Sequence, residues 1–273
     1  MKINIIICNN GLGHHKRIID ILSQLKKKNF RVFGSIKKLN KLTNIENFSF
    51  KVFDIESEIN NIENEILKKY KNEFLDMDFC WSDNLLFPYK YCKDTVITGS
   101  FLWCGHPNYV HSEEDLHLLR NNEVVLIGNK YFTRKNITQK LHFHPVGLFS
   151  KQKIKSNVHK KTNAILISSG QTDTVKNFLE KQIIKNLRDI EILSSSSIIY
   201  LESDIFSRIS FKSKNIREAL FDQKMFKEIG SAVIRPGMGT ISECWSNMVK
   251  IYPFFGENNS ELENNSNIVK NIQ

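Results

Sequence analysis

The chain has 273 residues, of which 41% are hydrophobic and 25% are charged. This length suits one large or two modest domains, and the composition is that of a globular protein, which excludes disorder as its main character. The formal net charge is +10, spread evenly over both halves and without clusters of basic and aromatic residues, so the sequence does not predict nucleic-acid binding. A positive surface favours polyanions, anionic lipid headgroups or phosphorylated substrates, although the abundance of Lys, Asn and Ile accounts for the total by composition alone.

The five cysteines are odd in number and scattered, and none forms a Cys-x-x-Cys pair. This pattern argues against a disulfide framework and against a zinc site, and it fits a reducing cytoplasm. The apolar run at residues 3–7 is too short for a signal peptide or a membrane span, and no other stretch approaches 18 apolar residues. We therefore expect a cytoplasmic protein that at most lies on the inner face of a membrane.

The first half alternates short apolar runs with helical patterns, which predicts an α/β domain with a mostly parallel sheet. Residues 3–7 form a buried strand, a glycine turn follows, a helix runs to about residue 29, and a second strand covers 31–35. The segment 55–74 is expected to be helical. The remaining expected strands of this half are 50–53, 77–81, 95–98, 124–127 and 143–146.

A polar segment at 151–163 is typical of an interdomain linker, and a second series of strands and helices follows it. We expect strands at 164–167, 198–201, 232–234 and 250–254, and a helix at 178–187. The chain is therefore predicted to hold an N-terminal domain at 1–150, a linker at 151–163 and a C-terminal domain at 164–273.

The first motif that could carry chemistry is Gly11-Leu-Gly-His-His-Lys-Arg17, directly after the first strand. A glycine turn lets the backbone approach a ligand closely, and the helix after it presents free N–H groups to an anion. Histidine is a residue type suited to general-base chemistry, so His14 could take a proton from a hydroxyl, or it could simply cap the helix. The turn is not the dinucleotide fingerprint Gly-x-Gly-x-x-Gly, and no acidic residue closes the second strand as an NAD site requires.

The second motif is Arg235-Pro-Gly-Met-Gly-Thr-Ile-Ser-Glu243, again after an apolar strand. Gly237, Gly239 and Thr240 open a helix in the manner that cradles a diphosphate, and Arg235 adds a positive charge. Glu243 comes three residues after Thr240. It could accept hydrogen bonds from ribose hydroxyls, or form a capping box with Thr240, or do both.

Asp83 ends the strand expected in the middle of the first half. It could orient His14 or an acceptor, or cap the following turn. The sequence shows no clear cluster of carboxylates for a metal, so neither a metal nor a cofactor is expected.

These motifs resemble those of GT-B glycosyltransferases of the UDP-glycosyltransferase and peptidoglycan N-acetylglucosaminyltransferase type. Gly13-His14-x-x-Arg17 resembles their N-terminal signature, and Arg235-x-Gly237-x-x-Thr240-x-x-Glu243 is similar to their donor pattern His-x-Gly-x-x-Ser-x-x-Glu. Weaker likenesses are Glu261-x-x-x-Asn265 to the end of the donor motif, Asp78–Asp83 to the mid-domain strand, and His144–Gly147 to the run-in to the linker.

The resemblance implies two Rossmann-like domains facing across a cleft, with the acceptor on the first and a nucleotide sugar, expected to be a UDP-sugar, on the second. His14 would be the general base toward an acceptor hydroxyl, with Asp83 beside it. Helix dipoles and a basic group would stabilise the leaving diphosphate without a metal. Glu243 would hold the ribose and Glu261 the sugar hydroxyls. The full donor-binding set is Gly13, Arg17, Arg235, Gly237, Gly239, Thr240, Glu243 and Glu261.

The sequence departs from the family in three places. Arg235 stands where the family has histidine, Met248-Val249-Lys250 stands where Gly-Val-Pro is usual, and the chain ends where the family continues, so the C-terminal domain is expected to be shortened. Two alternatives stay open. One is a nucleotide-sugar hydrolase of the pseudaminic acid pathway type, in which the histidine activates water. The other is a non-catalytic sugar-nucleotide-binding partner.

Overall fold

The computed structural model describes residues 1–9, 11–25, 29–42, 50–99, 125–133, 142–147, 163–169, 181–182, 185–210, 213–254 and 260–272. The chain divides into two compact units, Met1–Gly147 and Leu148–Gln273. Of the expected linker at 151–163, only Asn163 lies within the described residues, and half of the helix expected at 178–187 lies outside them.

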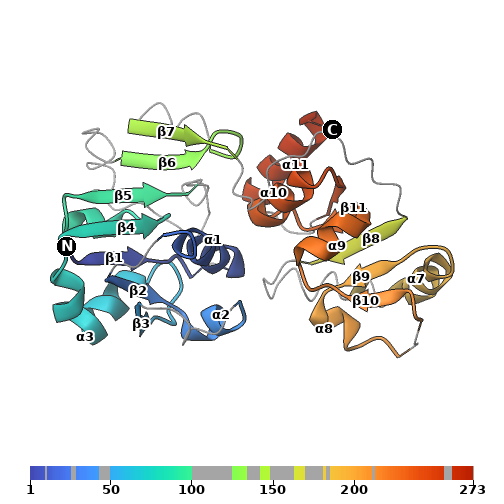
Figure 1. Cartoon of the computed structure of the whole chain (residues 1–273), viewed down its shortest axis with the longest axis horizontal. Helices are drawn as coiled ribbons and strands as arrows, with labels where there is room; N and C mark the ends of the chain where they lie inside the picture. The colour runs from blue at the N-terminus through green and yellow to red at the C-terminus, as the bar shows by residue number, and fades with distance from the viewer. Residues whose placement is uncertain are drawn as a thin grey trace. The chain divides into compact units, whose positions relative to one another are not determined.

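The N-terminal unit is built on a seven-stranded sheet in the order β3-β2-β1-β4-β5-β6-β7, with every neighbouring pair parallel (Figure 1). The strands are β1 (Ile3–Ile6), β2 (Phe30–Gly34), β3 (Lys51–Asp54), β4 (Phe79–Asp83), β5 (Thr95–Thr98), β6 (Val125–Asn129) and β7 (His142–Val146). The described helices are α1 (Leu12–Leu22), α2 (Ile36–Asn40), α3 (Ile62–Leu75) and the 3₁₀ turn η2 (Phe87–Lys90).

Both faces of this sheet are covered, which explains why β1 is apolar at nearly every position. Ile5 packs on one face with Ile18 of α1 and Val32 of β2. Ile6 packs on the other face with Phe33 and with Phe74 of α3. Because successive strand residues point to opposite faces, one short apolar run supplies both cores.

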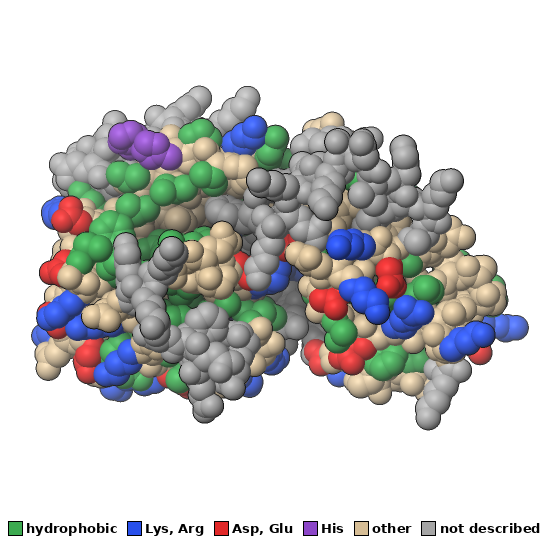
Figure 2. Space-filling model, viewed as in Figure 1, with side chains coloured by type: hydrophobic (Ala, Val, Ile, Leu, Met, Phe, Trp, Pro, Cys, Tyr) green, Lys and Arg blue, Asp and Glu red, His purple; other side chains and the backbone are tan. Residues whose placement is uncertain are grey.

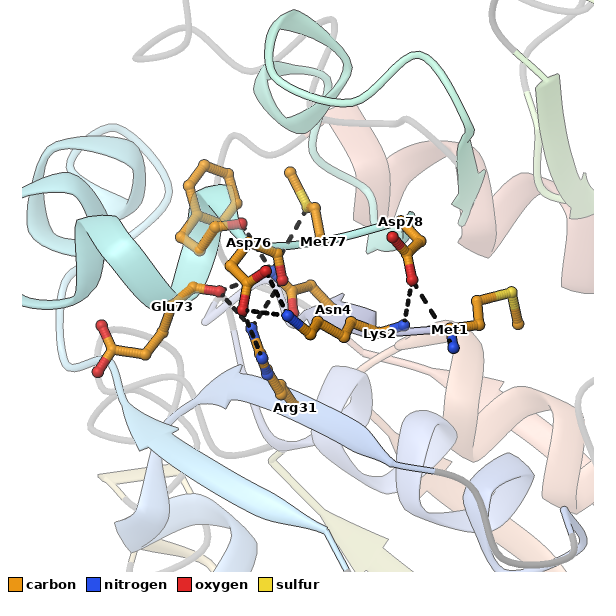
Figure 3. Close-up of polar contacts among 9 residues, drawn as sticks. Met1, Lys2, Asn4, Arg31, Glu73, Asp76, Met77 and Asp78 are labelled. Atoms are coloured by element: carbon orange, nitrogen blue, oxygen red, sulfur yellow. Dashed lines mark hydrogen bonds and ion pairs between the residues drawn. The ribbon is translucent and has the colours of Figure 1, made fainter.

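The edge of the sheet at which β1 begins is fastened by a polar cluster (Figure 3). Asn4, buried in β1, donates its side-chain amide to Phe74 O at 2.8 Å. Arg31 donates to the carbonyl oxygens of Glu73 and Asp76, each at 2.8 Å, and Asp76 also pairs with Lys2. These contacts hold the connection between α3 and β4 in place, and so fix where β4 enters the sheet.

The C-terminal unit has a five-stranded parallel sheet in the order β10-β9-β8-β11-β12. Its strands are β8 (Ala164–Ser168), β9 (Ile199–Leu201), β10 (Ile216–Glu218), β11 (Ile229–Ile234) and β12 (Lys250–Pro253). Its described helices are α7 (Leu187–Ser194), α8 (Ser203–Phe206), α9 (Gln223–Glu228), α10 (Met238–Ser246) and α11 (Ser260–Ile272).

The expected strands are all confirmed within three residues, while two helix boundaries are wrong. The first helix ends at Leu22 and does not continue to residue 29; the hydroxyl of Ser23 donates back to Asp20 O, and Leu25 is exposed. The helix expected within 55–74 begins only at Ile62, because Ile55 still donates its N–H to Gly34 O beside the sheet. Strand β10 was not predicted.

Candidate active site

Each sheet contains one point where the strand order reverses, and in open parallel sheets ligands bind outside the carboxyl ends of the strands at this point. In the N-terminal unit it lies between β1 and β4, and in the C-terminal unit between β8 and β11. The first glycine turn follows β1 and the second follows β11. Each motif found in the sequence therefore stands at the switch point of its own sheet.

The glycines of the first turn face open space. Gly11 begins α1 with φ of 102°, a conformation that favours glycine, and no side chain caps the helix. A Cβ atom added at Gly11 or Gly13 would meet nothing within 4 Å. At Gly128, by contrast, an added Cβ would lie 2.6 Å from the carbonyl oxygen of Gly99. The turn glycines thus leave room at an uncapped helix start, where backbone N–H groups can receive an anion.

His14, in the first turn of α1, points at the end of β4. Its Nδ1 lies 2.6 Å from Asp83 Oδ2, and Asp83 is fully buried whereas 20% of the His14 side chain is exposed. Parallel pairing of β1 with β4 brings Asp83 beside the turn. Because the carboxylate accepts from Nδ1–H, the neutral ring keeps its lone pair on Nε2, which is the form that a general base requires.

Arg17 lies one helical turn after His14 and shares the same carboxylate. Its Nη2 forms a short ion pair with Asp83 Oδ1 and lies 3.0 Å from His14 Nδ1. Burial alone would raise the pKa of Asp83, but the charges and hydrogen bonds of Arg17 and His14 outweigh burial and hold that pKa below its usual value. The carboxylate therefore stays ionised beside the histidine. The side chain of Arg17 is 8% exposed.

Asn84 is a site residue that sequence reasoning missed. It adopts φ of 60°, and its Nδ2 lies 3.5 Å from His14 Nδ1. The side chain sits against Gly99, where an added Cβ would be 1.7 Å from Asn84 Oδ1. Asn directly after a strand-ending Asp is a usable signal, because Asn tolerates the left-handed conformation better than most residues.

His15, next to the base candidate, is structural. It is fully buried, its Nδ1 lies 3.3 Å from Gly11 O, and its Nε2 accepts from the N–H of Ser35 at 3.1 Å. Burial, followed by the charge of Lys38, lowers its pKa to about 4. The neutral ring ties the glycine turn to the end of β2. Lys38 adds a second tie by donating to Asn9 O, which also accepts from Gly11 N.

Like the first turn, the second turn has glycines with open space beside them at the start of a helix that no side chain caps. Gly237 is the N-cap of α10 with no side-chain cap, and a Cβ at Gly237 or Gly239 would meet nothing within 4 Å. Because Gly237 is the N-cap and the helix begins at Met238, Thr240 is the third helical residue and not the cap. The alternative of a Thr240–Glu243 capping box is therefore wrong, while Glu243 lies partly exposed one turn further along α10.

Two neighbouring elements hold this second turn. The N–H of Arg235 donates to Ser168 O of β8 at 3.0 Å, and the side-chain amide of Asn265 on α11 donates to Pro236 O at 2.8 Å. Glu261 stands one turn before Asn265 on α11, and its side chain lies outside the described part of the structure.

Glu202 is a second residue at a strand end that sequence reasoning missed. It follows β9, is 7% exposed, and accepts hydrogen bonds from the hydroxyl of Ser168 and from the N–H and hydroxyl of Ser169. The sequence has no acidic residue closing the second strand of the N-terminal unit, but Glu202 closes the second strand of the C-terminal unit. An acidic residue directly after the second strand of a βαβ pattern was the available signal.

Among the residues that the structure describes, no group of three or more His, Cys, Asp and Glu side chains could hold a metal ion. The histidines visible in Figure 2 lie over β7, where the exposed rings of His142 and His144 stand 4.8 Å apart. In the same described part, no helix is long and apolar enough to cross a bilayer.

No protein-family model and no curated protein matches this sequence. Solved structures do match. UGT89C1 of Arabidopsis thaliana in complex with UDP-L-rhamnose has a TM-score of 0.59 at 12% identity, over 98% of this chain and 82% of its own. MurG of Acinetobacter baumannii has a TM-score of 0.59 at 14% identity, over 99% of this chain and 84% of its own.

The chain has the GT-B glycosyltransferase fold. The spinosyn forosaminyltransferase SpnP shares it with a TM-score of 0.58 at 8% identity, over 96% of this chain and 82% of its own. The expected α/β class and the resemblance to GT-B enzymes are thereby confirmed at the level of the fold. Since this chain spans 82–84% of these three GT-B structures, the expectation of a shortened fold is consistent with them.

Proposed function

We propose that this protein is a glycosyltransferase that moves a sugar from a nucleoside-diphosphate donor, a UDP-sugar, to an acceptor hydroxyl. The observation that carries the proposal is the pairing of His14 with the buried Asp83 at the switch point, beside a glycine turn that faces open space. The GT-B neighbours support the donor class, since UGT89C1 was solved both with UDP-L-rhamnose and with quercetin.

In this mechanism Nε2 of His14 removes the proton from the acceptor hydroxyl. The acceptor oxygen forms a bond to the anomeric carbon while the bond from that carbon to the diphosphate oxygen breaks, and UDP leaves with the electron pair. Asp83 stabilises the imidazolium that forms, as the carboxylate of a catalytic triad does. Arg17 was expected to bind the donor, but its side chain is nearly buried and paired with Asp83, so its assigned role is to act through Asp83 by keeping it ionised. General-base catalysis of this kind contributes about 10²–10⁴ in rate.

The donor diphosphate is assigned to the second turn. The free N–H groups at the start of α10, around Gly237 and Gly239, would hold the phosphates together with Thr240 and the charge of Arg235. These groups would neutralise the leaving UDP without a metal. Glu243 and Glu261 are assigned to the ribose and the sugar hydroxyls, and Gly13 leaves space for the donor at the first turn.

We further propose that the enzyme works in the cytoplasm. Basic side chains, which Figure 2 shows interspersed with acidic ones on one face, permit peripheral contact with the inner face of an anionic membrane if the acceptor is lipid-linked.

The test is to incubate the purified protein with UDP-sugars and follow UDP release. His14→Ala should abolish turnover and retain UDP binding, whereas His144→Ala, at an exposed histidine on β7, should change neither. Full activity of His14→Ala would refute the assignment of the base.

The products separate the alternatives. Free sugar released with UDP indicates transfer to water, and sugar 1-phosphate with UMP indicates a hydrolase that cuts within the diphosphate. Absence of any nucleotide-sugar binding would favour a non-catalytic partner.

A further inference from the structure

Glu202 is a buried carboxylate that the mechanism above does not use. It follows β9, whose neighbour in the sheet is β8, and its side chain reaches the residues at which β8 ends. Oε1 accepts from the hydroxyl of Ser168 at 3.1 Å, and Oε2 accepts from the N–H and the hydroxyl of Ser169 at 2.7 and 2.5 Å. All three residues are less than 10% exposed.

The burial of this carboxylate calls for a reason. Removing an ionised carboxylate from water is costly unless hydrogen bonds replace its hydration, and the three donors from Ser168 and Ser169 supply that replacement. Charge-assisted hydrogen bonds are short and directional, so they also fix the geometry of the donors. The end of β8 is therefore held by one side chain from the next strand.

The hydrogen bonds of Glu202 with Ser168 and Ser169, called the clamp below, are connected to the second glycine turn. Ser168, whose hydroxyl Glu202 holds, accepts the N–H of Arg235 through its carbonyl oxygen at 3.0 Å. Ser168 also pairs with Ile234 in the register of β8 and β11. Glu202, Ser168 and Arg235 thus join the ends of three adjacent strands, and the last two strands flank the switch point.

We propose that Glu202 is a positioning residue for the phosphate groups of the donor: it fixes the ends of β8 and β11, and thereby aims the turn that begins at Arg235. This inference rests on the proposed function, since it takes the ligand at the turn to be a nucleoside diphosphate. Glu202 touches no phosphate itself, and its carboxylate is occupied by the two serines.

The experiment compares the affinities of UDP and uridine, because only UDP carries the phosphates. UDP binding is measured by calorimetry and uridine binding by ligand-observed NMR, on the full chain. In Glu202→Ala, UDP should bind at least about 10-fold more weakly while uridine stays within about twofold of the wild type. Glu202→Gln keeps an acceptor for Ser169 and lets Ser168 donate or accept, so UDP affinity should recover to within about threefold.

Glu218→Ala is the matched control. Glu218 ends the neighbouring strand β10, is exposed, and also accepts a serine hydroxyl, from Ser203 at 2.5 Å. The variant Glu218→Ala should leave the affinities for UDP and for uridine unchanged. UDP affinity that is unchanged in Glu202→Ala would overturn the proposal, and so would an equal loss for UDP and uridine, which would indicate direct contact with the ribose or general damage to the fold.

Backbone hydrogen exchange without nucleotide provides a readout that does not depend on the donor. Exchange of the Ser169 N–H should rise in Glu202→Ala and stay unchanged in Glu218→Ala, and equal exchange in both variants would refute the clamp. If the wild type binds no UDP, the proposed function fails and the phosphate role of Glu202 fails with it, whereas a changed exchange rate would still establish the clamp.

Discussion

The side-chain amide of Asn265 donates to the carbonyl oxygen of Pro236 at 2.8 Å, and both residues are buried. One residue of α11 therefore holds the middle of the second glycine turn, 29 positions earlier in the chain. The backbone around Pro236 cannot satisfy this carbonyl by itself, because it lies between a strand and a helix that has not yet begun.

Asn265→Ala should lower the free energy of unfolding by about 1–3 kcal/mol, because it leaves the buried Pro236 carbonyl without a donor. Asn265→Asp should cost more, since it replaces the donor with a carboxylate in the same buried position. Urea denaturation measures both. Asn267→Ala, at an exposed position on the same helix, is the control and should have little effect. Equal stabilities of all three variants would show that the contact contributes nothing.

Asp83→Asn should reduce turnover by about 10²–10⁴, because an amide can no longer stabilise the imidazolium of His14. It should also destabilise the fold by about 3–5 kcal/mol, since the buried guanidinium of Arg17 loses its counter-ion. Kinetics and chemical denaturation measure the two effects. The double variant Arg17→Met/Asp83→Asn should recover part of the stability and none of the activity. If it recovered activity, Asp83 would have no role toward His14.

Stability should fall as the pH is lowered from about 6.5 to about 4, because of His15. Its pKa is lowered to about 4 in the folded state, mainly by burial, against 6.5 as the ordinary value. Below pH 6.5 His15 is protonated in the unfolded chain but stays neutral in the folded chain. The free energy of unfolding therefore falls, by about 3 kcal/mol near pH 4. Above pH 6.5 both states are neutral and this contribution is constant.

His15→Gln removes this titration and should flatten the pH dependence of the unfolding free energy between pH 6.5 and 4. The variant is expected to be less stable than the wild type at pH 7. His144→Ala should keep the wild-type slope. Denaturation series at several pH values measure the slopes, and an unchanged slope in His15→Gln would exclude His15 as its source.

Gly99→Ala should destabilise the protein by about 1–3 kcal/mol and reduce activity together. The residue has φ of 148°, and its new Cβ would lie 1.7 Å from Asn84 Oδ1, so it must displace the side chain beside His14. Thermal unfolding and turnover measure the two effects. Wild-type values for both would show that the contact between Gly99 and Asn84 is unimportant.

The strands of both sheets were predictable because most are short apolar runs ended by turns. Strand β10 shows why this signal can fail: only Ile216 is buried, while Arg217 and Glu218 are exposed, so no apolar run exists. The start of α3 was missed for a different reason. The carboxylate of Glu65 accepts from the N–H groups of Glu56 and Ser57, which holds that segment out of the helix.

The candidate site was predictable mainly where its residues are close in sequence, although the expected place of Asp83 beside His14, 69 positions away, is confirmed. The two glycine turns follow from spacing within nine residues, and His14 follows from its place in the first. Arg17 pairs with Asp83 across 66 positions, and Glu202 with Ser169 across 33. Such pairs depend on which strands become neighbours, and that arrangement is decided by packing on both faces of the sheet, not by any local pattern.

The open space beside the turn glycines makes them unusual positions for engineering. A methyl group at Gly13 or Gly239 meets no protein atom within 4 Å, and each glycine lies in the first turn of a helix, where alanine is the better helix former. If the proposed ligands bind at these turns, alanine there should change the shape of the space available to them while leaving the scaffold intact. Each glycine could therefore be replaced by alanine in turn and the variant tested with donors or acceptors that lack one substituent. A preference for the smaller substrate would show that the added methyl group has changed specificity.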